Sequence, residues 1–466
     1  MQSYNPFNKG INELKTEDLA ALRSVCEGWY IEYKQEISKA DAIAKSISAL
    51  ANTYGGWLFY GIKEMSKENS VAGEFLGIDN IDVDGALQRI RQAVASMVSP
   101  DCRYEVKALY GPCDDLQLPD DKAIICVAVP QSIEAPHIHK KGLIYRRIAD
   151  GSEPVAENDR HIINKMLDRS EQIKSEYREW LEEDPELSKG ESGHPHIRLM
   201  ITTNPWRAPR TNFLLSLDSA RDALGANSDS FRTIPFDTFY TSSRGVIARQ
   251  CLNRDPISST LTWHIYRSLS SDVSIPLNVI SGSTESLSTL LHNHNTGRRF
   301  SASLGNSKIE WAKLVDLNIL FHVIMGVIES HRALLQKAEW PCEFGVKIKI
   351  INAWRTVPYL DTEFFLEHVE KNGIPVCLTE NCTNPPGSDP DTFIQIKEST
   401  SGDSEQVKVA VQTFRVFIPI AEAFGIPLSD LLLKEFSEDN RVGSPIYDSL
   451  ITAGKHAASL SKKNQH

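Results

Sequence analysis

The chain has 466 residues, of which 41% are hydrophobic and 24% are charged, and its net charge is −11. This length exceeds what one hydrophobic core usually supports, so we expect two or three domains of ordinary globular composition. The acidic excess lies mostly in the first 200 residues, with 24 basic against 33 acidic side chains, which argues against a protein that binds nucleic acid through a uniformly basic surface.

The sequence indicates a cytoplasmic protein without a membrane span. Its first residues lack the basic and apolar segments of a secretory signal. The longest apolar stretch, residues 318–328, is shorter than the roughly 20 residues that cross a bilayer, so we interpret it as a buried helix. The eight cysteines include no C-x-x-C pair, which favours reduced thiols over a zinc ribbon.

Residues 1–165 predict an α/β domain with a mixed sheet and flanking helices. Helical spacing predicts helices over residues 12–25, 39–53 and 81–98. Aromatic, β-branched or apolar runs predict strands over residues 29–34, 57–62, 104–109, 123–129 and 142–148. The second helix should end at residues 52–56, whose Asn and Gly residues are typical of a helix stop.

The remaining chain predicts a second α/β or α+β domain. Residues 166–196 should hold the end of a charged helix and a polar linker, residues 197–454 the second domain, and residues 455–466 a mobile tail. Within that domain we predict strands over residues 197–204 and 344–354 and a helix over residues 312–338, whereas residues 405–424 are ambiguous.

Two carboxylates near the first strand are candidates for chemistry. Glu27 precedes this strand and Glu32 lies within it, and such groups are costly to bury unless they bind a cation. Lys34 shares the strand face of Glu32. On spacing alone, this pattern favours an exposed polar strand face with a surface Glu–Lys pair. The functional alternative is a hard-metal site with an adjacent lysine, as in many nucleases.

A glycine-containing turn follows the second helix. Gly55 and Gly56, preceded by Asn52 and Thr53, permit a sharp turn or the close approach of a phosphate, and Gly61 ends the next strand. The chain contains no G-x-x-x-x-G-K-[ST] motif, so we favour a structural turn over an ATP-binding loop.

The ordered set of these motifs resembles the AlbA-type Schlafen domain over about residues 12–165. In chain order, the motifs are E-x4-E-Y-K at residues 27–34, A-L-A-N-T-x-G-G at 49–56, G-I at 61–62, I-Y-R-R at 144–147 and S-E-P-V-A at 152–156. Domains of this family associate with nucleic acid, and vertebrate Schlafens pair two such modules and cleave transfer or ribosomal RNA with three metal-binding acidic residues.

The resemblance implies a Mg²⁺ or Mn²⁺ site built from Glu27, Glu32 and Glu64, with Lys34 beside it as a further catalytic group. The third acid departs from the family pattern, because Lys63 stands where an acidic residue is usual and Glu64 follows it. If Lys63 occupies that place, the metal site is incomplete.

The resemblance implies a metal-dependent endoribonuclease that acts on tRNA or structured RNA, with an antiviral defence role left open. The alternatives are a non-catalytic, DNA-binding transcriptional regulator and an ATP-binding switch protein. Because the chain has one such module where vertebrate Schlafens have two, we expect a homodimer. The best local basic strip for binding phosphates consists of Lys140, Lys141, Arg146 and Arg147. The alternative is that these residues lie on a solvated loop and strand edge.

Histidine and arginine patterns elsewhere are weaker. Three His-x-His pairs at 137/139, 194/196 and 292/294 have a spacing that can bind Zn²⁺ or Ni²⁺, but we interpret them as ordinary loop histidines because ligand partners at tight spacing are scarce. Aromatic residues stand beside arginines at 206–210, 298–300 and 354–355, where they fit either base stacking or cation–π pairs.

Overall fold

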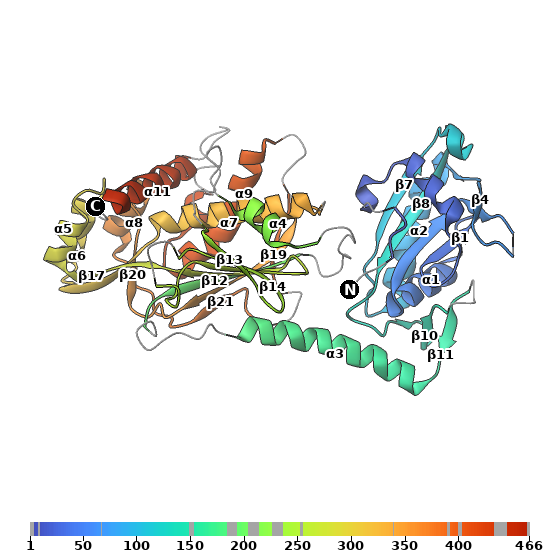
Figure 1. Ribbon diagram of the computed structural model, residues 1–466, viewed down its shortest axis with the longest axis horizontal. Helices are drawn as coiled ribbons and strands as arrows, with labels where there is room; N and C mark the ends of the chain where they lie inside the picture. Colours follow the sequence, from blue (N-terminus) through green and yellow to red (C-terminus); the bar gives the residue numbers. More distant parts are fainter. Residues whose placement is uncertain are drawn as a thin grey trace. The chain divides into compact units, whose positions relative to one another are not determined.

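The computed structural model describes residues 4–7, 10–66, 68–148, 153–183, 193–203, 214–225, 236–251, 255–338, 340–388, 392–398, 403–432 and 445–463. Both helices and strands are abundant, which confirms the predicted mixed α/β class. The chain divides near Trp180 into two compact units (Figure 1).

The N-terminal unit is built on a sheet in the order β1-β2-β8-β5, with β7 on the other edge of β8. Its strands are β1 (Ile31–Lys34), β2 (Gly55–Tyr60), β5 (Ile78–Asp79), β7 (Glu105–Tyr110) and β8 (Lys122–Pro130). β1 runs parallel to β2 and the other pairs are antiparallel. β1 is therefore an outer strand of this sheet.

The two faces of β2 explain its continuous apolar sequence. Leu58 and Tyr60 pack with helices α1 (Ala40–Asn52) and α2 (Asn80–Met97) on one face. Trp57 and Phe59 point to the opposite face, because side chains alternate along a strand. Both faces are covered, so no polar position is needed within the strand.

The second face is covered by 3-10 segments rather than by the α-helix predicted over residues 12–25. These are η1 (Ile11–Glu13) and η2 (Thr16–Ser24). Leu19 and Leu22 are both buried there. Their spacing of three residues places them on one side of a 3-10 helix, which has three residues per turn.

Smaller elements complete the N-terminal unit. Hairpin β3–β4 is antiparallel, and a second sheet has the order β11-β10-β9-β6. The bounds are β3 (Ile62–Glu64), β4 (Ala72–Phe75), β6 (Val98–Ser99), η3 (Asp114–Leu116), β9 (Ile138–His139), β10 (Leu143–Arg146), β11 (Val155–Glu157) and α3 (Arg160–Glu182).

The C-terminal unit contains an eight-stranded antiparallel sheet, in the order β13-β14-β15-β16-β12-β19-β21 with β22 also on β19, and a three-stranded sheet β17-β18-β20. The larger sheet comprises β12 (His196–Thr203), β13 (Thr238–Thr241), β14 (Gly245–Arg249), β15 (Thr262–Tyr266), β16 (Ser271–Pro276), β19 (Phe344–Ile351), β21 (Cys382–Asn384) and β22 (Ile394–Ile396). The smaller sheet comprises β17 (Asn278–Ser283), β18 (Trp311–Asp316) and β20 (Thr356–Tyr359).

Helices of the C-terminal unit include the apolar segment singled out in the sequence. Their bounds are α4 (Leu217–Leu224), α5 (Thr284–Leu290), α6 (Gly297–Asn306), α7 (Asn318–Lys337), α8 (Glu363–Asn372), α9 (Glu405–Ala423) and α11 (Pro445–Lys463). Residues 318–328 form the first half of α7, whose side chains are largely buried, so the buried-helix prediction is confirmed. Within the described part of the chain, none of the helices is long and apolar enough to cross a membrane.

Two predictions for this unit were wrong. The helix predicted over residues 312–338 begins only at Asn318, because the preceding residues form β18 in the three-stranded sheet. Of the mobile tail expected over residues 455–466, residues 455–463 form the end of helix α11, which packs against α7, and residues 464–466 lie outside the described part of the chain. Leu450, Ala453 and Ala457 are buried at helical spacing, and this apolar stripe explains why the segment folds onto the unit.

Candidate functional site

Glu27 lies at the outer edge of β1. Its Oε1 accepts a hydrogen bond of 2.5 Å from the backbone N–H of Tyr33. The backbone N–H of Glu27 donates to the carbonyl of Ser70 at 3.0 Å, just before β4. The carboxylate therefore covers an outer strand edge, and its backbone is held by the β3–β4 hairpin.

Glu64, rather than Lys63, approaches Glu27. The Lys63 side chain forms an ion pair with Glu74, with Nζ 2.6 Å from Oε1. Glu64 follows a register shift in the β3–β4 pairing and is close enough to Glu27 for its charge to affect the pKa of that carboxyl. Of the two candidates for the third acidic position, Glu64 is therefore the one that lies near Glu27.

Glu27 is held in an environment that disfavours its charged form. Burial and, to a smaller extent, the neighbouring Glu64 raise the pKa of Glu27 to about 8, although the Tyr33 N–H opposes the shift. Among the described residues, no donor reaches its buried second oxygen, Oε2, and a hydrogen bond between the Glu27 and Glu64 carboxyls requires that one of them keeps its proton. Two adjacent acids with a buried, unpartnered oxygen are unfavourable unless they share a proton or a cation.

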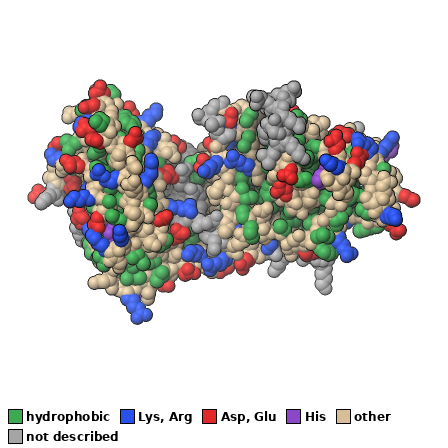
Figure 2. Space-filling view, turned by 180° about the vertical axis from the view of Figure 1, so that it is seen from behind, with side chains coloured by type: hydrophobic (Ala, Val, Ile, Leu, Met, Phe, Trp, Pro, Cys, Tyr) green, Lys and Arg blue, Asp and Glu red, His purple; other side chains and the backbone are tan. Residues whose placement is uncertain are grey.

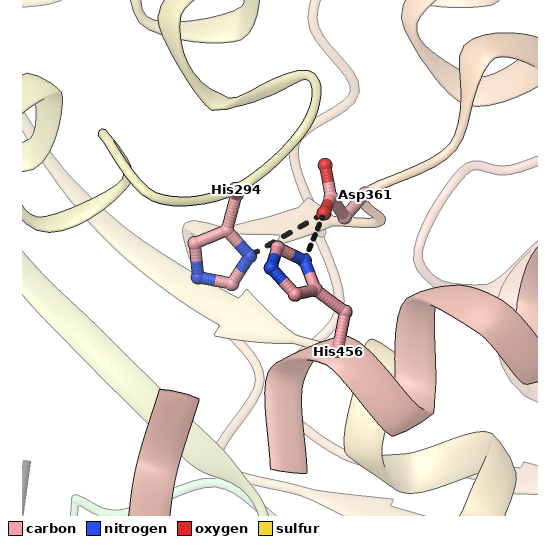
Figure 3. Close-up of side chains that lie close together, drawn as sticks. All are labelled: His294, Asp361 and His456. Atoms are coloured by element: carbon pink, nitrogen blue, oxygen red, sulfur yellow. Dashed lines mark hydrogen bonds and ion pairs between the residues drawn. The ribbon is translucent and has the colours of Figure 1, made fainter. Parts of the chain in front are cut away.

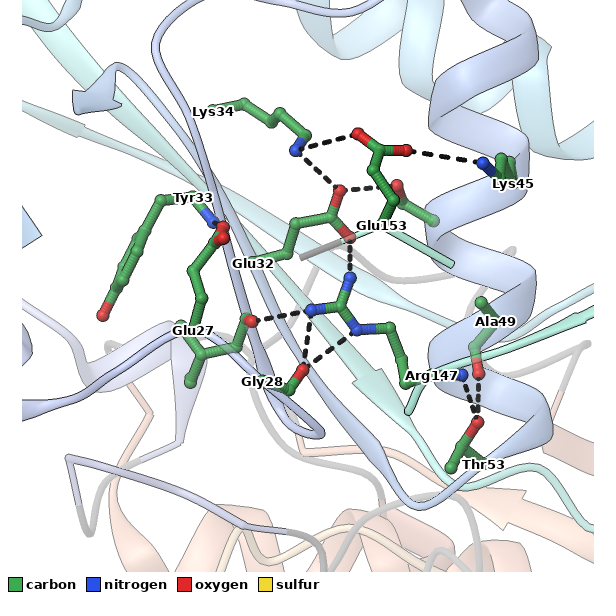
Figure 4. Close-up of polar contacts among 12 residues, drawn as sticks. Glu27, Gly28, Glu32, Tyr33, Lys34, Lys45, Ala49, Thr53, Arg147 and Glu153 are labelled. Carbon is green, nitrogen blue, oxygen red and sulfur yellow. Dashed lines mark hydrogen bonds and ion pairs between the residues drawn. The ribbon is translucent and has the colours of Figure 1, made fainter. Parts of the chain in front are cut away.

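Glu32 has a different environment, inside the domain. Its Oε2 lies 3.0 Å from Nη1 of Arg147, and its Oε1 accepts from the Ser46 hydroxyl at 2.8 Å and lies 3.1 Å from Nζ of Lys34 (Figure 4). The side chains of Glu32 and Arg147 are fully buried. Glu32 is therefore neutralised by protein groups.

The predicted three-carboxylate metal site is not assembled in this arrangement. Glu27, Glu32 and Glu64 are all described, but their carboxylate oxygens do not all lie within 4.8 Å of one another. One metal ion could not contact all three side chains at such separations. The residues fit a two-carboxylate site at Glu27 and Glu64. They do not fit a three-carboxylate site, because Glu32 is committed to Arg147.

Arg147 was predicted to contact phosphate, and the structure corrects this. Its Nη2 donates to the carbonyls of Gly28, at 2.6 Å, and Ile31, at 3.2 Å (Figure 4). Since Nη1 faces Glu32 and the side chain is unexposed, the guanidinium is used entirely inside the protein. Arg147 thus joins the end of β10 to the start of β1.

The remaining members of the basic strip are largely paired with acids. Lys140 and Lys141 are exposed, and Nζ of Lys141 lies 2.7 Å from Asp41. Arg146 forms an ion pair with Glu157 on the neighbouring strand β11. Figure 2 shows basic and acidic side chains interspersed over the face that it draws. The four residues do not form one continuous cationic strip.

Lys34 is a partly exposed cation near Glu32 and Glu27. Although burial opposes its charge, Glu32 and Glu27 outweigh this effect and raise the pKa of Lys34. Its Nζ also lies 3.8 Å from Glu153, which in turn approaches Lys45 at 3.4 Å (Figure 4). Lys34 therefore stays protonated and keeps a fixed position beside the site.

The polar residues of the glycine-containing turn bind the protein backbone. The Asn52 side chain donates to the carbonyls of His137 and Tyr145, at 3.0 and 2.9 Å. The Thr53 hydroxyl donates to the carbonyl of Ala49 and accepts from the backbone N–H of Arg147. These contacts support a structural turn.

The glycines of this turn are required by close backbone approach. A Cβ on Gly56 would lie 2.2 Å from the carbonyl oxygen of Tyr30, and Gly55 and Gly61 have φ angles of 73° and 94°. The turn therefore packs against the chain itself, and its contacts give no support to a phosphate-binding role.

Candidate residues in the second unit are also placed by the structure. Residues 206–210 lie outside the described residues. Arg299 forms ion pairs with Glu363 and Glu370, and Arg355 lies 5.7 Å from the ring of Trp354. These contacts account for the arginines without nucleic acid.

Comparison with known proteins confirms the resemblance for the N-terminal unit. Residues 27–156 match the family model described as "Schlafen, AlbA_2", a range that contains Glu27, Glu32, Lys34, Glu64 and Arg147. This match supports a nucleic-acid-related function for the unit. The comparison with curated proteins finds no match.

Among solved structures, the chain is similar to the DIP2311 protein from Corynebacterium diphtheriae, with 16% sequence identity and a TM-score of 0.20. The similarity covers 49% of this chain and 42% of that chain, so it spans less than half of the length of the solved protein.

Proposed function

Because the N-terminal unit is a Schlafen AlbA-type domain, we propose that it binds RNA and is a metal-dependent endoribonuclease for tRNA or other structured RNA. The observation that carries the proposal is the buried, unpartnered Oε2 of Glu27 beside Glu64. Carboxylate oxygens are the preferred ligands of Mg²⁺ and Mn²⁺, and one such ion would relieve the repulsion between these two acids.

Each residue then has a distinct task. Glu27 and Glu64 would hold the ion, and the Tyr33 N–H orients the carboxylate of Glu27. A bound divalent ion would neutralise phosphate charge and make a water more acidic. Lys34 provides positive charge for the RNA phosphate, and Glu32 positions Lys34 through the ion pair between them.

The test is cleavage of tRNA by the full-length protein with Mn²⁺. We expect Glu27→Gln and Glu64→Gln to abolish cleavage and to weaken Mn²⁺ binding, while tRNA binding persists. Glu74→Gln is the matched control, because Glu74 lies in the same hairpin but pairs with Lys63. Equal cleavage by wild type and both Gln variants would refute the proposal.

A non-catalytic nucleic-acid-binding regulator is the second candidate function. It is favoured by the Glu32–Arg147 pair, which removes one carboxylate from any metal site. Under this alternative, the wild-type protein binds tRNA or duplex DNA without cleaving it, and Glu27→Gln leaves that binding unchanged. The same assays therefore distinguish the two functions.

We also propose that the protein acts as a homodimer in the cytoplasm, because one copy of the domain presents one candidate site. Sedimentation of the active protein tests this assembly, and an active monomer would exclude it.

A further inference from the structure

We propose that the C-terminal unit binds one Zn²⁺ ion through His294, Asp361 and His456. These residues come from three segments that are distant in sequence: the turn between α5 and α6, the connection between β20 and α8, and helix α11 (Figure 3). The site lies in the other unit from Glu27 and Glu64, so the inference is independent of the proposed nuclease function.

The three ligand atoms have the spacing of a metal site. Nδ1 of His294 lies 3.7 Å and Nδ1 of His456 lies 3.3 Å from Oδ2 of Asp361, and the three potential ligand atoms lie within 4.8 Å of one another (Figure 3). Ligands at the usual Zn–N and Zn–O distances in a tetrahedral site are about 3.4 Å apart. Small side-chain movements would complete this geometry.

Asp361 is held as a fixed carboxylate by surrounding donors. Its Oδ1 accepts from the backbone N–H and hydroxyl of Thr296, at 2.7 and 2.9 Å, and from the Tyr359 hydroxyl at 3.3 Å. Its Oδ2 accepts from the backbone and side-chain nitrogens of Asn295, at 3.0 and 3.1 Å. Such hydrogen bonds commonly orient the carboxylate ligands of metal ions.

His294 provides an independent indication of a missing ligand. Its side chain is only 9% exposed, and its buried Nδ1 points toward Asp361 at 3.7 Å, a distance too long for a hydrogen bond, with no hydrogen-bond partner among the described residues (Figure 3). The ring packs edge-on against Tyr359, with centroids 5.5 Å apart. A buried imidazole nitrogen without a partner is unfavourable, and a metal ion would satisfy it.

The ligand set identifies the class of ion. Two imidazole nitrogens and one carboxylate oxygen suit divalent transition metals such as Zn²⁺ and Fe²⁺, whereas Mg²⁺ and Ca²⁺ prefer oxygen ligands. Within this class we commit to Zn²⁺, which needs no redox partner. Three protein ligands leave a fourth position for water or another small ligand. The His456 side chain is 30% exposed, so solvent reaches this side of the cluster.

The sequence pattern had indicated only part of this site. His294 belongs to a His-x-His pair, but His292 is exposed and its Nε2 faces Arg298 instead. The second histidine comes from α11, in a segment where we had expected a mobile tail. An ion at this position would fasten α11 to β20 and to the turn before α6.

The test is Zn²⁺ titration of the chelator-treated full-length protein in a Glu27→Gln/Glu64→Gln background, which removes the candidate site of the N-terminal unit. We expect one Zn²⁺ per chain by calorimetry and elemental analysis. Replacement by Co²⁺ should give the visible absorption of a four-coordinate ion. His294→Ala and His456→Ala should each weaken binding at least tenfold.

His292→Ala is the matched control and should bind Zn²⁺ as the unsubstituted protein does. Among the described residues, the His456 side chain hydrogen-bonds to Asp361 alone, so His456→Ala should keep its fold. His456→Gln provides a second variant if it does not. The proposal is overturned if the protein with all three ligands binds no Zn²⁺, or if the folded His456 variant binds it equally. Either result identifies the cluster as a plain hydrogen-bonded network.

Discussion

Replacing Arg147 by Met removes the charge that neutralises Glu32 but keeps most of the apolar stem. The variant leaves the fully buried Glu32 carboxylate with Ser46 and the partly exposed Lys34 as its remaining partners. Removing one member of a buried ion pair typically costs about 3–5 kcal/mol. The carbonyls of Gly28 and Ile31 also lose donors, which adds to the cost.

The expected loss is large compared with the stability of a typical domain, about 5–15 kcal/mol. Urea denaturation, combined with hydrogen exchange at amides of β1 and β10, measures it for the N-terminal unit separately. Glu32→Leu/Arg147→Met should be more stable than Arg147→Met alone, because no unpaired charge remains. If Arg147→Met costs less than about 1 kcal/mol, the pair behaves like an exposed ion pair and our interpretation is refuted.

Further predictions concern pH, backbone packing and helix docking. The pKa of Glu27 is raised from 4.5 to about 8, so the native state binds more protons than the unfolded state between these values, and stability should fall as pH rises through that window. Denaturation at several pH values should therefore show that Glu27→Gln gains stability relative to wild type as pH rises. If the variant shows no such gain, the raised pKa that we attribute to the partly buried Glu27 carboxyl is wrong. Gly56→Ala should destabilise the β1–β2 pairing by at least about 1–3 kcal/mol, because its Cβ would meet the Tyr30 carbonyl, and an unchanged urea midpoint would contradict this packing. Leu450→Ala should lower the free energy of unfolding of the C-terminal unit by about 2–5 kcal/mol, because Leu450 is buried where α11 packs on the unit. A change below about 0.5 kcal/mol, as is usual for surface substitutions, would show that α11 is not docked.

Local sequence patterns were sufficient for most regular elements. The apolar run at residues 57–60 predicted a buried strand because alternate side chains enter two separate cores on the faces of β2. The apolar run at residues 318–328 predicted a buried helix for a similar local reason. The boundary before α7 was missed because apolar residues of β18 extend the same hydrophobic pattern.

The sequence by itself determined the family of the first domain, its mixed α/β class, and the pair of acids in its first motif, because these depend on residue types at short spacings. It could not show that Glu32 is neutralised inside the domain while Glu27 lies beside a second acid. Only the tertiary structure brought Arg147 to Glu32, across 115 residues of sequence, and Glu64 to Glu27. The same is true of His294, Asp361 and His456, whose proximity depends on how α11 packs. Burial and charge at a site depend on such long-range contacts, which short sequence patterns do not encode.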